Sequence, residues 1–296
     1  MSDSILTVRD LVKDFDEGAV LEGVDLDVAE NETTVLMGPN GAGKTILLAC
    51  MAGGLFPDEG EIDVLGETPS AARSKLSFLI QGGLGLPMLT GRENVDFYSE
   101  LHPAATDGWT DIVDRMNLDD DLDRPVEDYS GGMVRKLELA ISLSVDVPLY
   151  LLDEPTAELD LTTIDQLHSI LESKKDEGKT VVMTSHTPLD VEVADRVVFV
   201  QYGRAVAEGD PQALLDEVPE VVRVVGTADF EAISEHVRGG RLFDTGDGRR
   251  GFLQNGTDVD ELREVATRGD RQPEVELAEA SYTDLFNYYT RIAPEK

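Results

Sequence analysis

Residues 38–45 read Gly-Pro-Asn-Gly-Ala-Gly-Lys-Thr, which fits the phosphate-loop pattern G-x-x-x-x-G-K-[ST] at every fixed position. An apolar, β-branched stretch, residues 33–37, precedes the loop, and a run of good helix formers, residues 46–52, follows it. A glycine-rich turn can match this pattern by chance, but the order strand, loop, helix is the context that the motif requires. The loop therefore predicts an α/β fold with a phosphate site at the start of a helix.

The residue types of this loop suit a ligand that carries several phosphates. Three glycines let successive backbone amides point at one anion, and the positive end of the following helix adds to that field. Lys44 can reach the outer phosphates, and the Thr45 hydroxyl can ligate Mg²⁺. We therefore assign nucleotide binding to the whole loop, which consists of Gly38, Pro39, Asn40, Gly41, Ala42, Gly43, Lys44 and Thr45.

A second apolar strand, residues 148–152, delivers two adjacent carboxylates, Asp153 and Glu154. Adjacent residues of a strand point to opposite faces, so we expect them to have different tasks. Asp153 suits the shell of Mg²⁺ beside Thr45, and Glu154 suits a base that polarises water near the outermost phosphate. The alternative is ordinary loop polarity at a strand end, but the upstream phosphate loop favours the functional interpretation.

Two further polar residues follow predicted strands. Gln81 ends the strand 75–80, and the glycines within 82–85 predict a loop that can move its amide. His186 follows the buried strand 180–185, which favours a place at the same ligand edge as the carboxylates. A lone glutamine or histidine is more often a surface residue, so both assignments depend on the neighbouring motifs.

Two helix starts carry capping signals. Thr90 followed by Glu93 forms the sequence of a capping box. Ser130, Gly131 and Gly132 precede another helix, where they fit either a simple N-cap or a second anion-binding helix start.

Residues 4–28 alternate apolar and polar positions, which predicts antiparallel strands joined by a turn around Asp16-Glu17-Gly18. Phe15 lies just before this turn. It can stack on a purine ring or belong to the core, and its spacing alone favours the core.

Asp and Glu number 60 against 25 Lys and Arg, a formal net charge of −35. Such a surface repels nucleic acid and anionic lipid. The acids are spread along the chain, which favours adaptation to a salt-rich cytoplasm over a single acidic partner-binding face. The single cysteine, Cys50, excludes an intrachain disulfide. With no signal-peptide pattern and no apolar run of about 18 residues, we expect a cytoplasmic protein.

Together these motifs resemble the ATP-binding subunits of ABC transporters over residues 4–215. The matches are the Walker A loop at 38–45, the Q-loop at Gln81, the signature at 130–133, Walker B at 149–154, the D-loop at 157–160 and the switch His186. The resemblance implies a P-loop NTPase of ABC ATPase type with an N-terminal antiparallel β subdomain and a helical subdomain at about 88–145. Alternating strand and helix patterns after Pro219 predict a small C-terminal α+β appendage, residues 219–296.

The resemblance also implies a mechanism. Two cassettes would pair head to tail, so that Ser130, Gly131 and Gly132 of one subunit close on the γ-phosphate held by the other. Glu154 would polarise the attacking water, and His186 and Gln81 would sense the γ-phosphate and the metal. Asp160 would communicate across the dimer. Phe15 stands where the family keeps an adenine-stacking aromatic, which reverses the preference from spacing.

The signature departs from the common family form, with Tyr129 in place of leucine and Met133 in place of glutamine. This form resembles the subgroup with separate permeases that exports drugs, lipids or polysaccharides. We expect an Mg²⁺-dependent ATPase at the inner face of the membrane, with residues 81–92 touching a permease and no nucleic-acid contact. The alternatives are a soluble ABC ATPase of DNA repair or translation and a nucleotide-gated regulator. The first usually needs a coiled coil or a second cassette, and Glu154 and His186 speak against the second.

Overall fold

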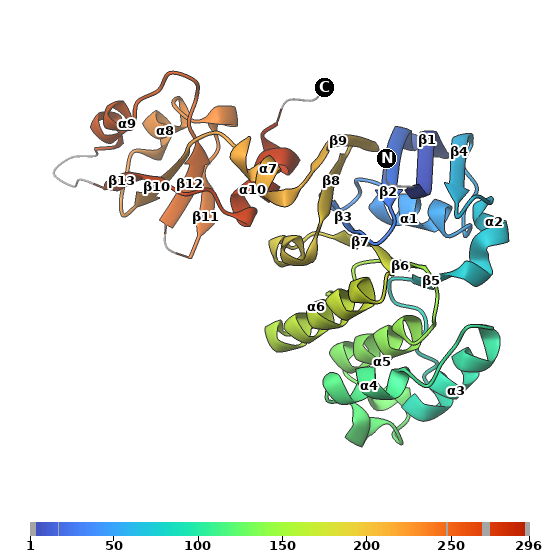
Figure 1. Cartoon of the computed structure of the whole chain (residues 1–296). Coiled ribbons are helices and arrows are strands. Elements are labelled where there is room, and N and C mark those ends of the chain that lie inside the picture. Colours follow the sequence, from blue (N-terminus) through green and yellow to red (C-terminus); the bar gives the residue numbers. More distant parts are fainter. Residues whose placement is uncertain (1–3, 17, 247, 268–272, 294–296) are drawn as a thin grey trace. The chain divides into compact units, whose positions relative to one another are not determined.

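The structure is a computed structural model that describes residues 4–16, 18–246, 248–267 and 273–293. Its backbone divides into two compact units, Met1–Glu208 and Gly209–Lys296. Among the described residues, the first unit is built on two sheets and the second on one, and each unit has its own buried apolar cluster. They are described one after the other, and Figure 1 labels their helices and strands.

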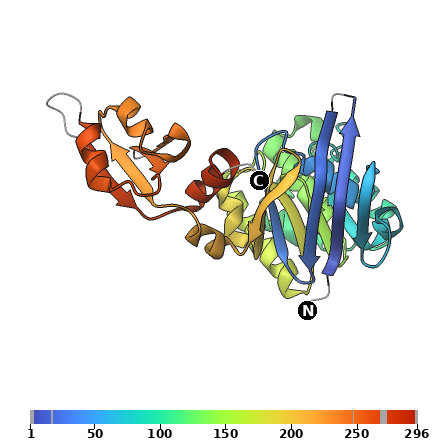
Figure 2. The same cartoon turned by 90° about the horizontal axis from the view of Figure 1, so that it is seen from above.

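The first unit begins with a three-stranded antiparallel sheet of order β2-β1-β4. Figure 2 shows the two longest strands, β1 and β2, side by side. Their predicted antiparallel pairing is confirmed; Glu17 of the predicted turn lies outside the described residues. The strands are β1 (Ser4–Phe15), β2 (Gly18–Ala29) and β4 (Glu59–Val64).

The second sheet of this unit has the order β5-β6-β7-β3-β8-β9, and every pair from β5 to β8 is parallel. All residues of β3, β6 and β7 are buried, as expected for parallel strands covered on both faces. Parallel strands end at one edge, so the loops after β3, β5, β6 and β7 meet there. The strands are β3 (Thr33–Met37), β5 (Leu76–Leu79), β6 (Leu149–Leu152), β7 (Thr180–Ser185), β8 (Arg196–Gln201) and β9 (Arg204–Gly209).

Helix α1 (Lys44–Met51) begins with the last two residues of the phosphate loop, Lys44 and Thr45. Its side chains Leu47, Leu48 and Met51 are fully buried in one cluster with apolar residues of both sheets. The loop is therefore fixed between a buried strand and a buried helix. Two other helices of the unit are α2 (Pro69–Ala72) and α6 (Leu161–Asp176).

Three helices form the helical region between β5 and β6, where α3 and α4 both pack on α5 (Figure 1). The predicted capping box is confirmed, because Thr90 and Glu93 exchange both of its hydrogen bonds. The helices are α3 (Gly91–Leu101), α4 (Trp109–Arg115) and α5 (Gly131–Leu143).

The second unit holds a four-stranded antiparallel sheet of order β11-β12-β10-β13. With α8 after β10 and α9 after β12, its chain order is that of a split β-α-β, ferredoxin-like fold. Residues of α8 and α9 join those of β10 and β13 in one apolar cluster, while Tyr288 of α10 packs edge-to-face on Phe252. The elements are α7 (Pro211–Asp216), β10 (Val221–Val225), α8 (Phe230–Ser234), β11 (Phe243–Thr245), β12 (Gly248–Phe252), α9 (Val259–Ala266), β13 (Glu274–Ala278) and α10 (Tyr282–Arg291).

Short 3-10 helices complete the described elements, at Arg73–Lys75, Asp119–Asp121, Val126–Asp128, Pro188–Val193 and Arg238–Gly240. Among the described residues, no helix has both the length and the apolar character needed to span a bilayer.

Candidate active site

The phosphate loop connects β3 to α1, and two of its glycines are required by close contacts. A Cβ added to Gly38 would lie 2.1 Å from the carbonyl oxygen of Val200. Gly43 caps α1 with a φ of 98°, in the left-handed region, and a Cβ there would lie 2.7 Å from Leu21 Cδ2. The sequence pattern thus reflects the tight packing of this loop against its neighbours.

Lys44 points back into its own loop. Its Nζ donates to the carbonyl oxygens of Gly38, at 2.7 Å, and Pro39, at 3.2 Å. Burial lowers the pKa of Lys44, against the opposing effect of the negative charges of Glu154 and Asp153. The loop therefore holds a buried cation whose partners are neutral carbonyls, and an anion entering the loop would be a stronger partner for it.

Asp153 lies fully buried beside Thr45. Its Oδ1 accepts hydrogen bonds from Thr45 Oγ1, at 3.1 Å, and Thr184 Oγ1, at 2.6 Å. Its Oδ2 is buried and has no hydrogen-bond partner among the described residues. Such an oxygen calls for an explanation, and a carboxylate next to a hydroxyl suits Mg²⁺, which takes few protein ligands besides water and substrate phosphates. The residues therefore fit the metal.

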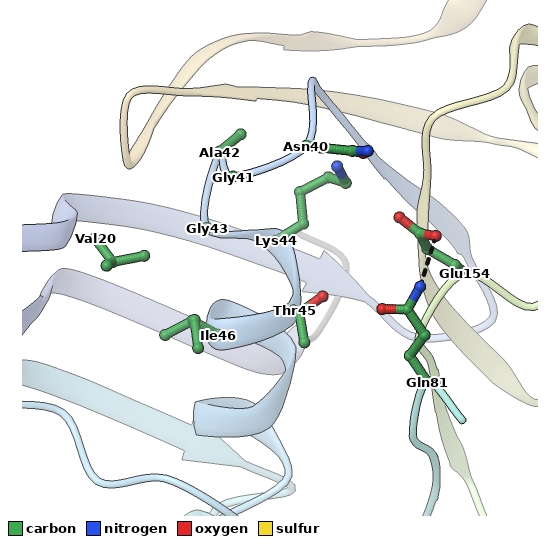
Figure 3. A pocket seen from close by; sticks show the side chains of 10 residues that line it. All are labelled: Val20, Asn40, Gly41, Ala42, Gly43, Lys44, Thr45, Ile46, Gln81 and Glu154. Carbon is green, nitrogen blue, oxygen red and sulfur yellow. Dashed lines mark hydrogen bonds between the residues drawn. The ribbon is translucent and has the colours of Figure 1, made fainter. Parts of the chain in front are cut away.

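Glu154 is held by groups at the ends of two other strands, β5 and β7. Its backbone N–H donates to Thr184 Oγ1 at 2.8 Å. Its Oε2 accepts from Gln81 Nε2 at 3.1 Å, drawn as a dashed line in Figure 3. Its Oε1 lies 3.3 Å from His186 Nδ1. The carboxylate thus stands between the two polar residues that the sequence singled out at strand ends.

The prediction that strand alternation points Asp153 and Glu154 to opposite faces is wrong, although the environments of the two side chains do differ. The strand β6 ends at Leu152, so both acids lie beyond it and strand alternation does not separate them. Glu154 has a φ of 46°, in the left-handed region. This turn of the backbone, rather than a pleat, directs Asp153 inward and Glu154 toward the loop.

A pocket of about 260 Å³ joins the phosphate loop to Glu154 and Gln81 (Figure 3). Asp153 adjoins it through Thr45, and His186 through Glu154. The predicted nucleotide, metal and water-polarising residues are thereby brought together. The lining residues are Val20, Asn40, Gly41, Ala42, Gly43, Lys44, Thr45, Ile46, Gln81 and Glu154.

Phe15 lies at the end of β1 and is 44% exposed. The core position that its spacing favoured is therefore wrong. The ammonium of Lys13 lies 5.4 Å from the centroid of its ring. As described, the pocket lining does not include Phe15, so its role toward a purine stays a prediction.

The signature and Asp160 occupy helix starts outside the described pocket lining. Ser130 caps α5, and its Oγ accepts from Met133 N at 3.3 Å. Asp160 caps α6 in the same way, and its hydrogen bond from Thr163 N, at 2.8 Å, lowers the pKa of Asp160. Both residues are N-caps in the single chain, and a second task for either stays a prediction.

Sequence reasoning missed Thr184, whose hydroxyl donates to Asp153 and accepts from Glu154. The signal was its place near the end of a buried strand. The register pairs Leu152 of β6 with Met183 of β7, which puts Thr184 beside Asp153. Only the neighbourhood of β6 and β7 turns this threonine into a site residue.

Comparisons with known proteins agree with the geometry. A family model described as ABC transporter matches residues 21–157. Daunorubicin resistance ATP-binding protein DrrA3 of Streptomyces coeruleorubidus is 33% identical over 240 residues, covering 76% of this chain and 76% of that protein. Nod factor export ATP-binding protein I of Rhizobium sp. (strain N33) is 32% identical over 249 residues, covering 79% of this chain and 81% of that protein.

Solved structures share the fold at lower identity. An ATP-binding subunit of an ABC transporter superposes with a TM-score of 0.66 at 23% identity, over 72% of this chain and 93% of its own. The ATP-binding cassette MJ0796, a dimer bound to ADP and Pi, superposes with a TM-score of 0.64 at 24% identity, over 69% of this chain and 98% of its own.

Proposed function

The chain belongs to the ABC transporter family of ATP-binding proteins, and from this membership we propose that it is an Mg²⁺-dependent ATPase subunit that powers a separate membrane permease. The observation that carries the chemical part is the position of Glu154. Its carboxylate lines the pocket formed by the phosphate loop and is held by Gln81 and His186.

The chemistry follows from what these side chains can hold. Lys44 exchanges its two loop carbonyls for phosphate oxygens, and the loop amides surround the same anion. Glu154 accepts a proton from the attacking water. Its carboxylate is oriented by its contacts with Gln81 and His186. Thr45 and Asp153 would hold Mg²⁺, which supplies charge neutralisation on the phosphates. Catalysis then consists mainly of positioning and electrostatic stabilisation.

We propose that the working form is a head-to-tail dimer. In the single chain, Ser130 and the signature glycines start a helix that the described pocket does not use. A helix N-terminus with exposed amides attracts anions, so a phosphate held by a second copy would give it a partner. The dimeric structure of MJ0796, which has the same fold, supports the pairing of two cassettes. The partner cassette is a second copy or a similar chain.

We propose export as the direction of transport. Relatives that are 33% and 32% identical to this chain over the aligned residues are named for daunorubicin resistance and for Nod factor export. Residues 81–92 would contact the permease and place the chain at the inner face of the membrane. We propose that residues 219–296 form an appended domain after the cassette of residues 4–215; the compact second unit, which begins at Gly209, supports such a division.

The net charge of −35 supports two further proposals. The surface is suited to a salt-rich cytoplasm, where ions screen the mutual repulsion of the acids. It also disfavours nucleic acid as a partner, which counts against a DNA-repair or translation ATPase.

Phosphate release by the purified chain, alone and with membranes carrying the permease, tests the function. We expect Mg²⁺-dependent hydrolysis that membranes with the permease alter and membranes without it do not. ATP binding without turnover in either case would favour the nucleotide-gated regulator and would contradict the proposal.

A further inference from the structure

Helix α5 carries a buried ion pair one turn beyond the signature. Arg135 is 5% exposed and Glu138 is 2% exposed, and Nη1 of the arginine lies 3.1 Å from Oε2 of the glutamate. Burying two charges is costly, and a buried pair is often no more stable than an apolar substitute. The other hydrogen bonds of the two side chains explain why the pair is buried here.

All five N–H groups of the Arg135 guanidinium have acceptors. Nη2 donates to the carbonyl oxygens of Glu154, at 2.7 Å, and Asp153. Nε donates to the carbonyl of Pro155 at 3.3 Å. Nη1 donates to Glu138 and to the carbonyl of Ile80 at 3.4 Å. One side chain thus binds three consecutive carbonyls around the proposed base and one beside Gln81.

These bonds fix a backbone conformation that is unfavourable by itself. A left-handed φ is uncommon outside glycine and persists where the surroundings hold it. Glu154, with a φ of 46°, is held by Arg135 at its carbonyl and by Thr184 at its N–H. The direction of its carboxylate therefore depends on a residue of α5.

Glu138 holds the loop that carries Gln81. Its Oε1 accepts from the backbone N–H groups of Gly83, at 3.2 Å, and Leu84, at 3.0 Å. Arg135 binds the carbonyl of Ile80 on the other side of Gln81. The glycine-rich segment that the sequence marked as movable is thus anchored on both sides by the same ion pair.

We propose that Arg135 and Glu138 are positioning residues for hydrolysis, which set the carboxylate of Glu154 and the amide of Gln81 in place from helix α5. The inference rests on the proposed ATPase function. Because Ser130 caps α5, a displacement of the signature would reach Glu154 through Arg135 and Gln81 through Glu138. Lysine cannot replace the arginine, since its ammonium has three donors and no planar fork.

The test compares Arg135→Lys and Glu138→Gln with Arg115→Lys, an arginine of α4 that binds Ser169 and serves as the matched control. We expect kcat to fall by about 10²-fold in Arg135→Lys, with KM for ATP and nucleotide affinity within about threefold of the parent. In Glu138→Gln, kcat should fall less, because an amide oxygen can still accept hydrogen bonds from the backbone N–H groups of Gly83 and Leu84. Arg115→Lys should retain the parent kcat.

A second arm separates positioning from general destabilisation. If Arg135 acts through Glu154, then Arg135→Lys should cause no further loss of the residual rate in a Glu154→Gln background. A further loss as large as in the parent, or parent kcat in a folded Arg135→Lys, would overturn the inference. If Arg135→Lys does not fold, the same comparison is made with Glu138→Gln in the parent and in the Glu154→Gln background, and the same two outcomes apply. A parent protein without ATPase activity would overturn the proposed function as well.

Discussion

The hydroxyl of Thr45 donates a hydrogen bond to Asp153 Oδ1 at 3.1 Å, although the two residues lie 108 positions apart in the chain. Their contact exists because β3 and β6 flank the same strand, β7, in one parallel sheet. The second oxygen of Asp153 is buried and has no hydrogen-bond partner among the described residues. This pairing is the physical basis for assigning the metal to these two side chains.

Asp153→Asn should weaken the binding of Mg²⁺-ATP by at least about tenfold, because it removes an anionic oxygen ligand. ATP binding in excess chelator should change much less. Thermal denaturation with ATP, across a Mg²⁺ titration, measures both. Asp165→Asn, at an exposed position of α6, is the matched control. If the Mg²⁺ titration of Asp153→Asn matched that of the parent, the assignment of Mg²⁺ to this site would be contradicted.

Glu154→Gln should lower the rate of ATP hydrolysis by about 10²–10⁴-fold, the usual contribution of a general base. ATP affinity should stay near the parent value, since the substitution keeps the shape of the side chain. Phosphate release and equilibrium ATP binding measure the two quantities, with Glu172→Gln on the exposed face of α6 as control. Hydrolysis at the parent rate would show that another group is the base.

The affinity for ATP should fall as the pH rises through the alkaline range. Burial puts the pKa of Lys44 below the ordinary 10.5 in the free protein, and a bound triphosphate would raise it again. ATP binding then takes up protons at pH values between the pKa of Lys44 in the free protein and its pKa in the complex. Calorimetry in two buffers of different ionisation enthalpy measures this uptake. In Lys44→Arg, where the charge persists at high pH, affinity should be flat with pH.

Cys50 should react very slowly with alkylating reagents in the folded protein. It is fully buried in α1, and burial raises the pKa of its thiol to about 11. At pH 8 only about one thiol in a thousand is then the reactive thiolate. Timed alkylation followed by mass spectrometry should show a rate more than about 10²-fold lower in buffer than in denaturant. Equal rates would mean that α1 opens readily.

The midpoint of thermal unfolding should rise with KCl into the molar range. With a net charge of −35, repulsion among the acids opposes the folded state, and the screening length falls to about 3 Å at 1 M salt. Circular dichroism at increasing KCl measures the shift. A protein that is equally stable in dilute buffer would contradict adaptation to a salt-rich cytoplasm.

Local sequence patterns predicted much of the fold. The phosphate loop before α1 and the capping box at Thr90 follow from the order of glycines, caps and apolar positions along a few residues. The strand β11 was not predicted, because three residues, Phe243–Thr245, are too few to show an alternation.

The sequence by itself determined the prediction of which side chains carry the chemistry, since Lys44, Asp153 and Glu154 belong to motifs that neighbouring residues define. The tertiary structure alone decided how they are held: Thr184 beside both acids, and Arg135 across three carbonyls from Asp153 to Pro155. The physical reason is the distance along the chain over which each kind of interaction acts. Periodicity and capping act within a few residues of one another, whereas these hydrogen bonds join segments that only the order of strands in the sheet and the packing of α5 bring together.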